Sequence, residues 1–236
     1  MSLQNRTVLV IGRGSGIANA VVNAVRAQGA KVVVAGRSTE ALTAAYSGQD
    51  IAVEYVDLTD EASIVALAER LGQVDHVVST GSARAKGQLA DLDPTLVSLS
   101  FTTKVVGPIM LAKHFGPRMP KDGSFVLLSG STALKPTAGM LAVGATNAAV
   151  NAVVRSLAVE LAPIRVNAVS PGTIDSGAYD GLGEQKKAEL FATRTETNPA
   201  GRIGYPDDIA SAVVFALSNT FLTGNSISID GGEPLV

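Results

Sequence analysis

The chain contains no cysteine and no tryptophan, and it has only two histidines among its 236 residues. Without cysteine it can form no disulfide, use no catalytic thiolate and build no thiolate metal site. Two histidines, His76 and His114, are too few for a histidine-rich metal site, so no metal centre is expected. Its chemistry must therefore come from hydroxyl, amide, amine and carboxyl groups, or from an organic cofactor.

The chain also lacks an excess of charge of either sign. Its net charge of -2 is too small to attract nucleic acid or an anionic membrane. The first residues, MSLQNRTVLVIG, reach a strand pattern at once and lack the features of a signal peptide. The charge-free stretch between Lys135 and Arg155 is interrupted by Pro136, Asn147 and Asn151, which favours a buried helix over a membrane span. We therefore expect a cytoplasmic protein with no nucleic-acid or membrane partner.

Short apolar, β-branched runs alternate with longer helical patterns along the whole chain. Seven runs predict strands, at 7–11, 31–35, 51–55, 74–79, 124–129, 164–170 and 226–230. Six patterns predict helices, at 17–28, 39–46, 61–71, 94–115, 138–161 and 206–217. Such alternation is typical of a parallel sheet covered on both faces. The sequence predicts an α/β fold, a single doubly wound Rossmann domain over 1–236 with a seven-stranded parallel sheet.

The longest irregular stretch runs over 171–202. It follows a predicted strand, and α/β proteins bind ligands at the carboxyl ends of their strands. Its polar segment EQKKAELFATRTE is compatible with a mobile helix. Long loops in compact domains often cover a ligand, so we interpret this stretch as a lid.

The first predicted strand ends in a glycine-rich turn that opens a helix. Gly12, Gly14 and Gly16 allow a tight turn and close approach of a pyrophosphate, and the following helix offers free N–H groups at its start. This strand–turn–helix context predicts a dinucleotide site, with a purely structural turn as the alternative.

The second predicted strand ends in Gly36, Arg37 and Ser38, where an NAD site usually has a carboxylate. A guanidinium can instead pair with a 2′-phosphate, and Arg13 in the glycine loop is placed to reach the same group. These residues predict NADP(H) as the cofactor. The alternative is that Arg37 is a solvated charge at a strand end.

Segments along essentially the whole chain resemble the motifs of the short-chain dehydrogenase/reductase family, of the kind that includes β-ketoacyl reductases. Residues 12–18 resemble its TGxxxGxG loop, 56–58 its adenine-contacting turn, 165–176 its segment beside nicotinamide, and 202–210 and 223–232 its two C-terminal signatures. The resemblance implies an oxidoreductase that forms a homo-oligomer, commonly a tetramer. The predicted cofactor-binding residues are Gly12, Arg13, Gly14, Ser15, Gly16, Ile17, Arg37, Ser38, Asp57, Leu58, Thr80, Gly81, Asn147, Pro171, Gly172, Ile174 and Ser176.

The departures from the family pattern gather at the expected reaction centre. The family's tyrosine and lysine fall on Val143 and Asn147, and its helix asparagine falls on Lys104. Its catalytic serine falls on Gly130 without a gap, or on Ser131 with a shift of one residue. In the family the tyrosine transfers the proton at the carbonyl oxygen, whereas the lysine lowers its pKa and binds the nicotinamide ribose. Val143 has no proton to transfer and Asn147 carries no charge, so help worth about 10²–10⁴ in rate lacks its usual source.

Two residues are candidates to replace that source. Lys104 can act as an acid if an apolar pocket lowers its pKa, and Ser131 can orient a carbonyl group. The alternatives are a solvated helix lysine and a serine that caps a turn. Structural roles are the default for the other residues considered, namely Lys135, Thr146, Tyr179 and Tyr205.

Two functions fit these patterns. The first is an NADP(H)-dependent oxidoreductase with non-standard catalytic residues, acting on a small carbonyl or alcohol substrate of unassigned identity. The second is a catalytically silent NADP(H)-binding sensor or partner subunit. A cofactor-free lyase fits poorly, because it would be expected to keep the tyrosine and lose the nucleotide site. The weakly charged helix at 138–161 predicts a subunit contact, and so a homodimer or homotetramer.

Overall fold

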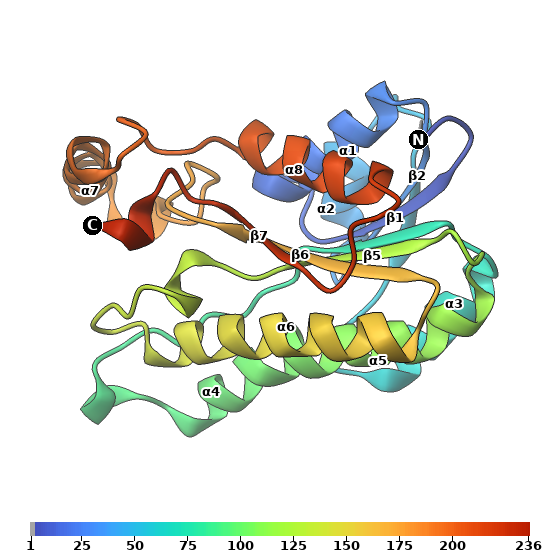
Figure 1. Ribbon diagram of the computed structural model, residues 1–236, viewed down its shortest axis with the longest axis horizontal. Helices are drawn as coiled ribbons and strands as arrows, with labels where there is room; N and C mark the ends of the chain where they lie inside the picture. The colour runs from blue at the N-terminus through green and yellow to red at the C-terminus, as the bar shows by residue number, and fades with distance from the viewer. Residues whose placement is uncertain (1–2) are drawn as a thin grey trace.

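The computed structural model describes residues 3–236, so Met1 and Ser2 of the predicted 1–236 domain lie outside the described part. Its centre is one sheet whose seven strands run parallel in the order β3-β2-β1-β4-β5-β6-β7 (Figure 1). The strands are β1 (Thr7–Ile11), β2 (Lys31–Gly36), β3 (Ala52–Tyr55), β4 (His76–Ser79), β5 (Ser124–Leu128), β6 (Arg165–Pro171) and β7 (Ser226–Ile229). The order reverses between β1 and β4, which confirms the predicted doubly wound Rossmann fold.

Helices cover both faces of this sheet (Figure 1). They are α1 (Gly16–Ala27), α2 (Thr39–Ala45), α3 (Glu61–Leu71), α4 (Pro94–Phe101), α5 (Gly107–Phe115), α6 (Leu141–Glu160), α7 (Glu184–Thr197) and α8 (Pro206–Ser218). Val8 and Val10 of β1 pack in the layer of α1 and α8, whereas Leu9 and Ile11 pack in the layer of α3, α5 and α6. Because successive side chains point to opposite faces and both faces are buried, inner strands such as β1 are continuous apolar runs.

The helix predicted at 94–115 is interrupted. Between α4 and α5 lies a π-helical turn, Thr102–Val106, in which the N–H of Gly107 bonds to the carbonyl of Thr102 five residues earlier. Pro108 follows directly and has no N–H to continue the regular α-helical pattern. Lys104, in the middle of this turn, is buried.

Two other expectations concern segments near the carboxyl ends of the strands. The helix predicted from 138 begins only at Leu141, because Gly139 has a φ of +75°, which lies outside the right-handed helical region. The segment predicted as a lid does contain a helix, α7, and none of its side chains is fully buried. In Figure 1 this helix stands apart from the layers that cover the sheet.

Two helical segments, Pro94–Arg118 and Leu141–Glu160, are long and apolar enough to cross a membrane by length and composition alone. Each also contributes to the core of the fold, through Phe115 on one and Val150 and Val154 on the other. Core helices of folded proteins meet the same criterion. Packing against the sheet accounts for the inward sides of both helices.

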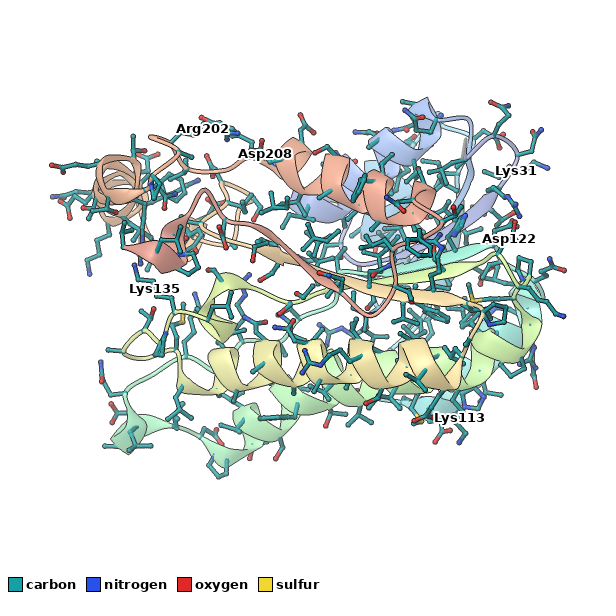
Figure 2. All side chains as sticks on the ribbon, in the orientation of Figure 1. Lys31, Lys113, Asp122, Lys135, Arg202 and Asp208 are labelled. Carbon is teal, nitrogen blue, oxygen red and sulfur yellow. The ribbon has the colours of Figure 1, made fainter. Side chains whose placement is uncertain are left out.

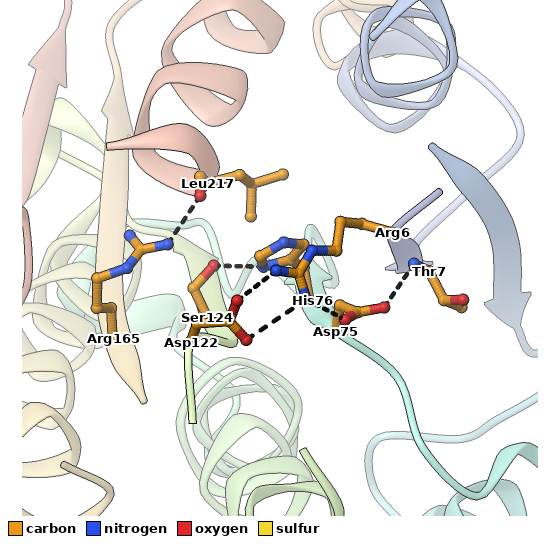
Figure 3. Close-up of polar contacts among 8 residues, drawn as sticks. All are labelled: Arg6, Thr7, Asp75, His76, Asp122, Ser124, Arg165 and Leu217. Atoms are coloured by element: carbon orange, nitrogen blue, oxygen red, sulfur yellow. Dashed lines mark hydrogen bonds and ion pairs between the residues drawn. The ribbon is translucent and has the colours of Figure 1, made fainter. Parts of the chain in front are cut away.

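A polar network lies at the edge where the strands begin (Figure 3). Arg6 donates to Asp75 over 2.7 Å and pairs with Asp122, while the Nδ1 atom of His76 lies 2.8 Å from the hydroxyl of Ser124. Because these residues belong to or flank β1, β4 and β5, the network joins three strands at this edge. Its position indicates a structural role.

The two edges of the sheet can be located by labelled side chains in Figure 2. Lys31 and Asp122 lie at the amino-terminal edge, whereas Lys135, Arg202 and Asp208 lie at the opposite end, where the strands finish. All predicted site residues lie near the carboxyl ends of the strands, either in the loops that follow the strands or on the helical segments that pack there. This separation makes Lys31 a useful control position for charge changes.

The buried imidazole of His76 should make stability depend on pH. Burial, opposed in part by the nearby Asp75 carboxylate, lowers the pKa of His76 from 6.5 to about 4. The unfolded chain therefore takes up a proton below pH 6.5 while the folded chain does not, so acidification favours unfolding. We expect His76 to reduce the free energy of unfolding by up to about 3 kcal/mol between pH 6.5 and 4.

Urea titrations across this range, with His76→Gln for comparison, test the expectation. Glutamine keeps a polar group beside Ser124 but does not titrate, so the variant should lose distinctly less stability on acidification. Equal pH slopes in the two proteins would contradict it. Carboxylates also titrate near pH 4 in both proteins, so the difference between the two stability curves isolates the contribution of His76.

Candidate active site

The loop between β1 and α1 leaves no room for side chains at its glycines. A Cβ atom at Gly12 would collide with Thr80, and one at Gly16, whose φ is +57°, would collide with the carbonyl of Ser176. Ser15 precedes α1 without a side-chain hydrogen bond to the helix, so the N–H groups of the first turn stay open. This bare backbone at a helix start fits a pyrophosphate group.

The remaining residues of the loop have separate roles. Gly14 lies so close to α2 that a Cβ would be 2.5 Å from that of Ala45. Ile17 is partly buried and packs against the core, so its backbone is the part that faces the loop. These glycine contacts are those of a closely packed turn, and the open N–H groups at the start of α1 are the feature that fits a nucleotide.

Two arginines stand beside this loop. Arg13 and Arg37 are exposed, and neither forms an ion pair within residues 3–236. Gly36 brings β2 against the loop, since a Cβ there would lie 2.8 Å from the carbonyl of Gly12. Ser38 accepts a hydrogen bond from the N–H of Ala41 and so caps α2. The donor set available at this corner is cationic, as a 2′-phosphate requires.

The ends of β3 and β4 form the next part of the site. Asp57 uses one carboxylate oxygen to accept from the N–H and hydroxyl of Thr59, at 2.9 and 2.8 Å. Leu58 is buried, and a Cβ at Gly81 would collide with its side chain. Thr80 donates to the carbonyl of Ile11 over 3.0 Å, which ties the end of β4 to the end of β1. These four predicted residues therefore share one edge with the glycine loop.

The end of β6 brings in the last predicted cofactor residues. Pro171 ends the strand, and Gly172 packs so tightly that a Cβ would lie 2.7 Å from the Cα of Asp230. Ile174 is buried in the core, which leaves only its backbone to face a cofactor. The carbonyl of Ser176 lies against Gly16, so this segment and the glycine loop are side by side.

The centre of the site is a buried contact between Lys104 and Asn147. The ammonium of Lys104 donates to the carbonyl of Ser129 over 3.0 Å and also to the Oδ1 atom of Asn147. The amide of Asn147 in turn donates to the hydroxyl of Thr132 over 2.7 Å. Lys104 is only 7% exposed, so the alternative of a solvated helix lysine is wrong.

This environment changes the acidity of the amine. Burial, together with the nearby Arg84 guanidinium, lowers the pKa of Lys104 to about 7. The carbonyl and amide oxygens accept hydrogen bonds from the ammonium and stabilise its charged form. Part of the Lys104 amine therefore stays protonated at neutral pH. A group with a pKa near the working pH is well suited to give and take a proton.

The positions around this contact differ from the family pattern in a connected way. In the alignment expected from motif spacing, the family's lysine falls on Asn147 and its asparagine on Lys104, and these two residues are the ones in contact. A Cβ at Gly130 would lie 2.5 Å from the amide nitrogen of Asn147, so a serine there would push the Asn147 side chain out of its present position. Val143, one turn before Asn147, is also buried and presents only apolar atoms.

Ser131 lies next to this group at the start of a short turn. It is buried, and its carbonyl accepts the N–H groups of Leu134 and Lys135, each over 2.9 Å. Its backbone therefore stabilises the turn, which is the structural role given as the alternative for this serine. Its hydroxyl remains the candidate for contacting a substrate.

A groove of about 610 Å³ runs beside this centre. Its walls are formed by the loop after β4, the segment after β5 and the start of α6, and they include Leu89, Thr132, Met140, Leu141 and Gly144. Thr132 belongs to the groove and also accepts the hydrogen bond from Asn147. The groove has a volume typical of small-molecule sites and is lined mainly by apolar groups.

The lid lies across from the loop after β4. Tyr179 contacts Phe191 of α7 edge-to-face, with ring centroids 5.7 Å apart, and the ammonium of Lys86 lies 5.8 Å from the centroid of the Tyr179 ring. Arg194 of α7 lies 3.6 Å from the buried carboxylate of Glu233. Neither Lys86 nor Glu233 was predicted from the sequence. Their charges, at positions before and after the predicted lid, are the only sequence feature that could have drawn attention to them.

The other residues considered as replacements have structural contacts. Thr146 donates to carbonyls of its own helix, Lys135 donates to the carbonyls of Glu233 and Val236, and Tyr205 is exposed at the start of α8. Within residues 3–236 there is no group of three or more histidines and carboxylates that could hold a metal ion. Lys104 and Asn147 are thus the polar groups that the structure brings together at the centre.

Comparisons with known proteins agree with this geometry. The model of a family described as enoyl-(acyl carrier protein) reductase matches residues 11–233. An uncharacterized oxidoreductase of Thermotoga maritima is 30% identical over 259 aligned residues, which cover all of both chains. The L-rhamnose 1-dehydrogenase (NAD(P)(+)) of Azotobacter vinelandii is 31% identical, and the alignment covers 98% of each chain.

The fold is also found among solved structures. A small-chain dehydrogenase in complex with NADPH has 31% sequence identity and a TM-score of 0.86, with 99% of this chain and 100% of that chain covered. Its likeness, like that of the two relatives, extends over the entire sheet and its helices. The chain belongs to the short-chain dehydrogenase/reductase family.

Proposed function

We propose that this protein is an NADP(H)-dependent oxidoreductase that interconverts a carbonyl compound and an alcohol, with Lys104 as the proton donor in place of the missing tyrosine. The observation that carries the proposal is the burial of the Lys104 ammonium between Ser129 and Asn147. The open glycine loop, Arg13 and Arg37 support the choice of cofactor. Hydride transfer is the chemistry that NADP(H) supplies when it is bound.

The residues of the chain would divide the remaining work. An ammonium has three N–H donors, and Lys104 uses two of them on Ser129 and Asn147. The third can bind the substrate's carbonyl oxygen and pass its proton to that oxygen as the alcohol forms. The amine becomes neutral, and solvent restores the proton. Asn147 holds the amine in place, and the hydroxyl of Ser131 is the second group proposed to orient the carbonyl.

The experiment that tests this proposal is a reductase assay across a panel of aldehydes and ketones, with NADPH consumption as the readout. Reduction of at least one class of compound is expected. Tight NADPH binding with no turnover across the panel would reject the proposal. That result would favour a catalytically silent sensor or partner subunit, the function supported by the loss of the tyrosine at Val143.

Replacement of Arg37 tests the cofactor assignment. A charge-assisted contact with the 2′-phosphate is worth roughly 1.5–3 kcal/mol. Arg37→Ala should therefore weaken NADPH binding by roughly ten- to a hundredfold and leave NADH binding almost unchanged. Calorimetric titration with both cofactors measures this, with Lys31→Ala at the opposite edge of the sheet as the charge control. Equal affinity of the native protein for NADH and NADPH would overturn the assignment.

We also propose that the protein is a homodimer or homotetramer that pairs through the outer sides of α4 and α6. Away from the groove, those sides expose apolar residues, namely Leu96, Leu99, Ala152 and Val159. An apolar surface of this kind on two neighbouring helices is typical of a subunit contact. The same contact explains why both helices are apolar enough to resemble membrane spans.

Light scattering at micromolar concentration tests the assembly. We expect a dimer or tetramer, and a smaller species for Ala152→Arg, because a charge there would be buried in the contact. Ala188→Arg on the exposed surface of α7 is the matched control and should leave the mass unchanged. A native species of about 24 kDa would show that the chain is monomeric.

A further inference from the structure

Three cations lie near one another on the substrate side of the site. Arg84 and Lys86 are in the loop after β4, and Lys104 is in the π-helical turn. The loop is fixed in place, because Ser100 donates to the carbonyl of Ala83 over 2.6 Å and Gly87 donates to the carbonyl of Gly139 over 3.0 Å. Arg84 is close enough to both lysines to lower the pKa of each, although burial is the larger cause for both.

None of the three cations forms an ion pair with a carboxylate in the part of the chain that the structure describes. The two lid aspartates, Asp175 and Asp180, already have a partner. Asp175 and Asp180 both bind Lys187, at 2.8 and 2.7 Å. The site therefore carries positive charge that the neighbouring lid carboxylates do not neutralise.

The loop that carries these cations leads into the groove beside α6. Lys86 lies over the ring of Tyr179, and the groove begins at Gly87 and Gln88, the two residues that follow Lys86. Arg84 and Lys86 are exposed on either side of the buried Ala85, so both face away from the core at the entrance of the groove.

We propose that the substrate is an anionic carbonyl compound, a keto acid, whose carboxylate binds to Arg84 and Lys86 while its carbonyl group faces Lys104. This inference rests on the proposed function, because it takes Lys104 to act on a carbonyl. It adds the class of substrate. A guanidinium and an ammonium exposed two residues apart in one loop are suited to a carboxylate, and the apolar groove accepts the remaining carbon chain.

Binding measured separately from turnover tests the proposal. The protein is first saturated with NADP⁺, and acetoacetate, levulinate and benzoylacetate are titrated in by calorimetry, each beside its methyl ester. At least one acid should bind about ten- to a hundredfold more tightly than its ester, because the ester cannot make the charge-assisted contacts. In Arg84→Gln/Lys86→Gln this preference should disappear, while NADP⁺ affinity stays within about twofold. Lys31→Gln, at the far edge of the sheet, should behave as the native protein does.

The outcomes separate the two proposals. Equal binding of acids and esters, no binding of any acid, or unchanged acid binding in the double variant would overturn the anionic substrate. A parallel loss of NADP⁺ affinity would assign the cations to the cofactor and overturn it as well. Selective acid binding without any turnover would keep the anion site and reject the oxidoreductase. Turnover of neutral ketones alone would keep the oxidoreductase and reject the anionic substrate.

Discussion

Lys104→Met is expected to reduce NADPH-dependent carbonyl reduction by about 100-fold or more, while NADPH affinity changes little. Methionine fills a similar volume but has no proton to give, and general acid catalysis is typically worth about 10²–10⁴ in rate. Steady-state kinetics with the best substrate of the panel measure the loss. The fall should be in kcat, since the proton is transferred during the reaction.

The pH dependence of kcat provides the companion measurement. Burial lowers the pKa of Lys104 to about 7, and reduction needs the protonated form. The native rate should therefore decline as the pH rises through about 7, and the residual rate of Lys104→Met should lack that decline. Lys113→Met is the control, because it removes an exposed lysine of α5 that pairs with Glu61. This variant should keep both the native rate and the native pH profile. Undiminished turnover in Lys104→Met would reject the lysine as the acid and direct attention to Ser131.

Asn147→Lys is expected to lower the melting temperature by about 6–12 °C. The new ammonium would lie against that of Lys104 in a buried site, and an uncompensated charge pair of this kind costs on the order of 3 kcal/mol. Differential scanning calorimetry at pH 7 measures the change. Restoring the family's tyrosine and lysine without changing Lys104 should thus fail for an electrostatic reason.

Exchanging the two side chains provides the control. Lys104→Asn/Asn147→Lys leaves one amine and one amide in contact, so it should recover most of the stability lost in Asn147→Lys. The two single variants and the double variant form a thermodynamic cycle that measures the coupling. Additive changes would show that the two residues do not depend on each other. Adding Val143→Tyr to the exchanged protein should then give activity only where the pocket admits the larger ring.

Much of the fold could be predicted from apolar periodicity. Each of the seven predicted strands is found. The inner strands are continuous runs of apolar residues because both faces of the sheet are buried there, whereas the edge strands β3 and β7 include polar residues and are partly exposed. The π-helical turn at Thr102–Val106 was not predicted, since it changes the register of a helix without changing which residues are apolar. The late start of α6 depends on the φ angle of Gly139, which a helical pattern does not reveal.

The site could be predicted in part. The glycine loop between β1 and α1 follows from motif spacing, because its position is fixed relative to a strand end. The departures at Val143 and Asn147 rest on the same spacing and stay a prediction. The contact between Lys104 and Asn147 joins residues 43 positions apart and arises only when the π-helical turn and α6 pack together. The roles of Thr132 and Arg84 were likewise hidden, because each depends on a neighbour supplied by another element.

The packing at Gly130 also limits which residues the site tolerates in combination. Asparagine at both 104 and 147 would place two neutral amides together, whereas lysine at both would place two like charges in a buried site. A stepwise exchange of the two residues would therefore be easier through the paired asparagines. A Cβ at Gly130 lies 2.5 Å from the amide nitrogen of Asn147, so a serine at 130 would push that side chain away from Thr132 and Lys104. The identities of residues 104, 130 and 147 are thus coupled, and a change at one position alters which residues fit at the others.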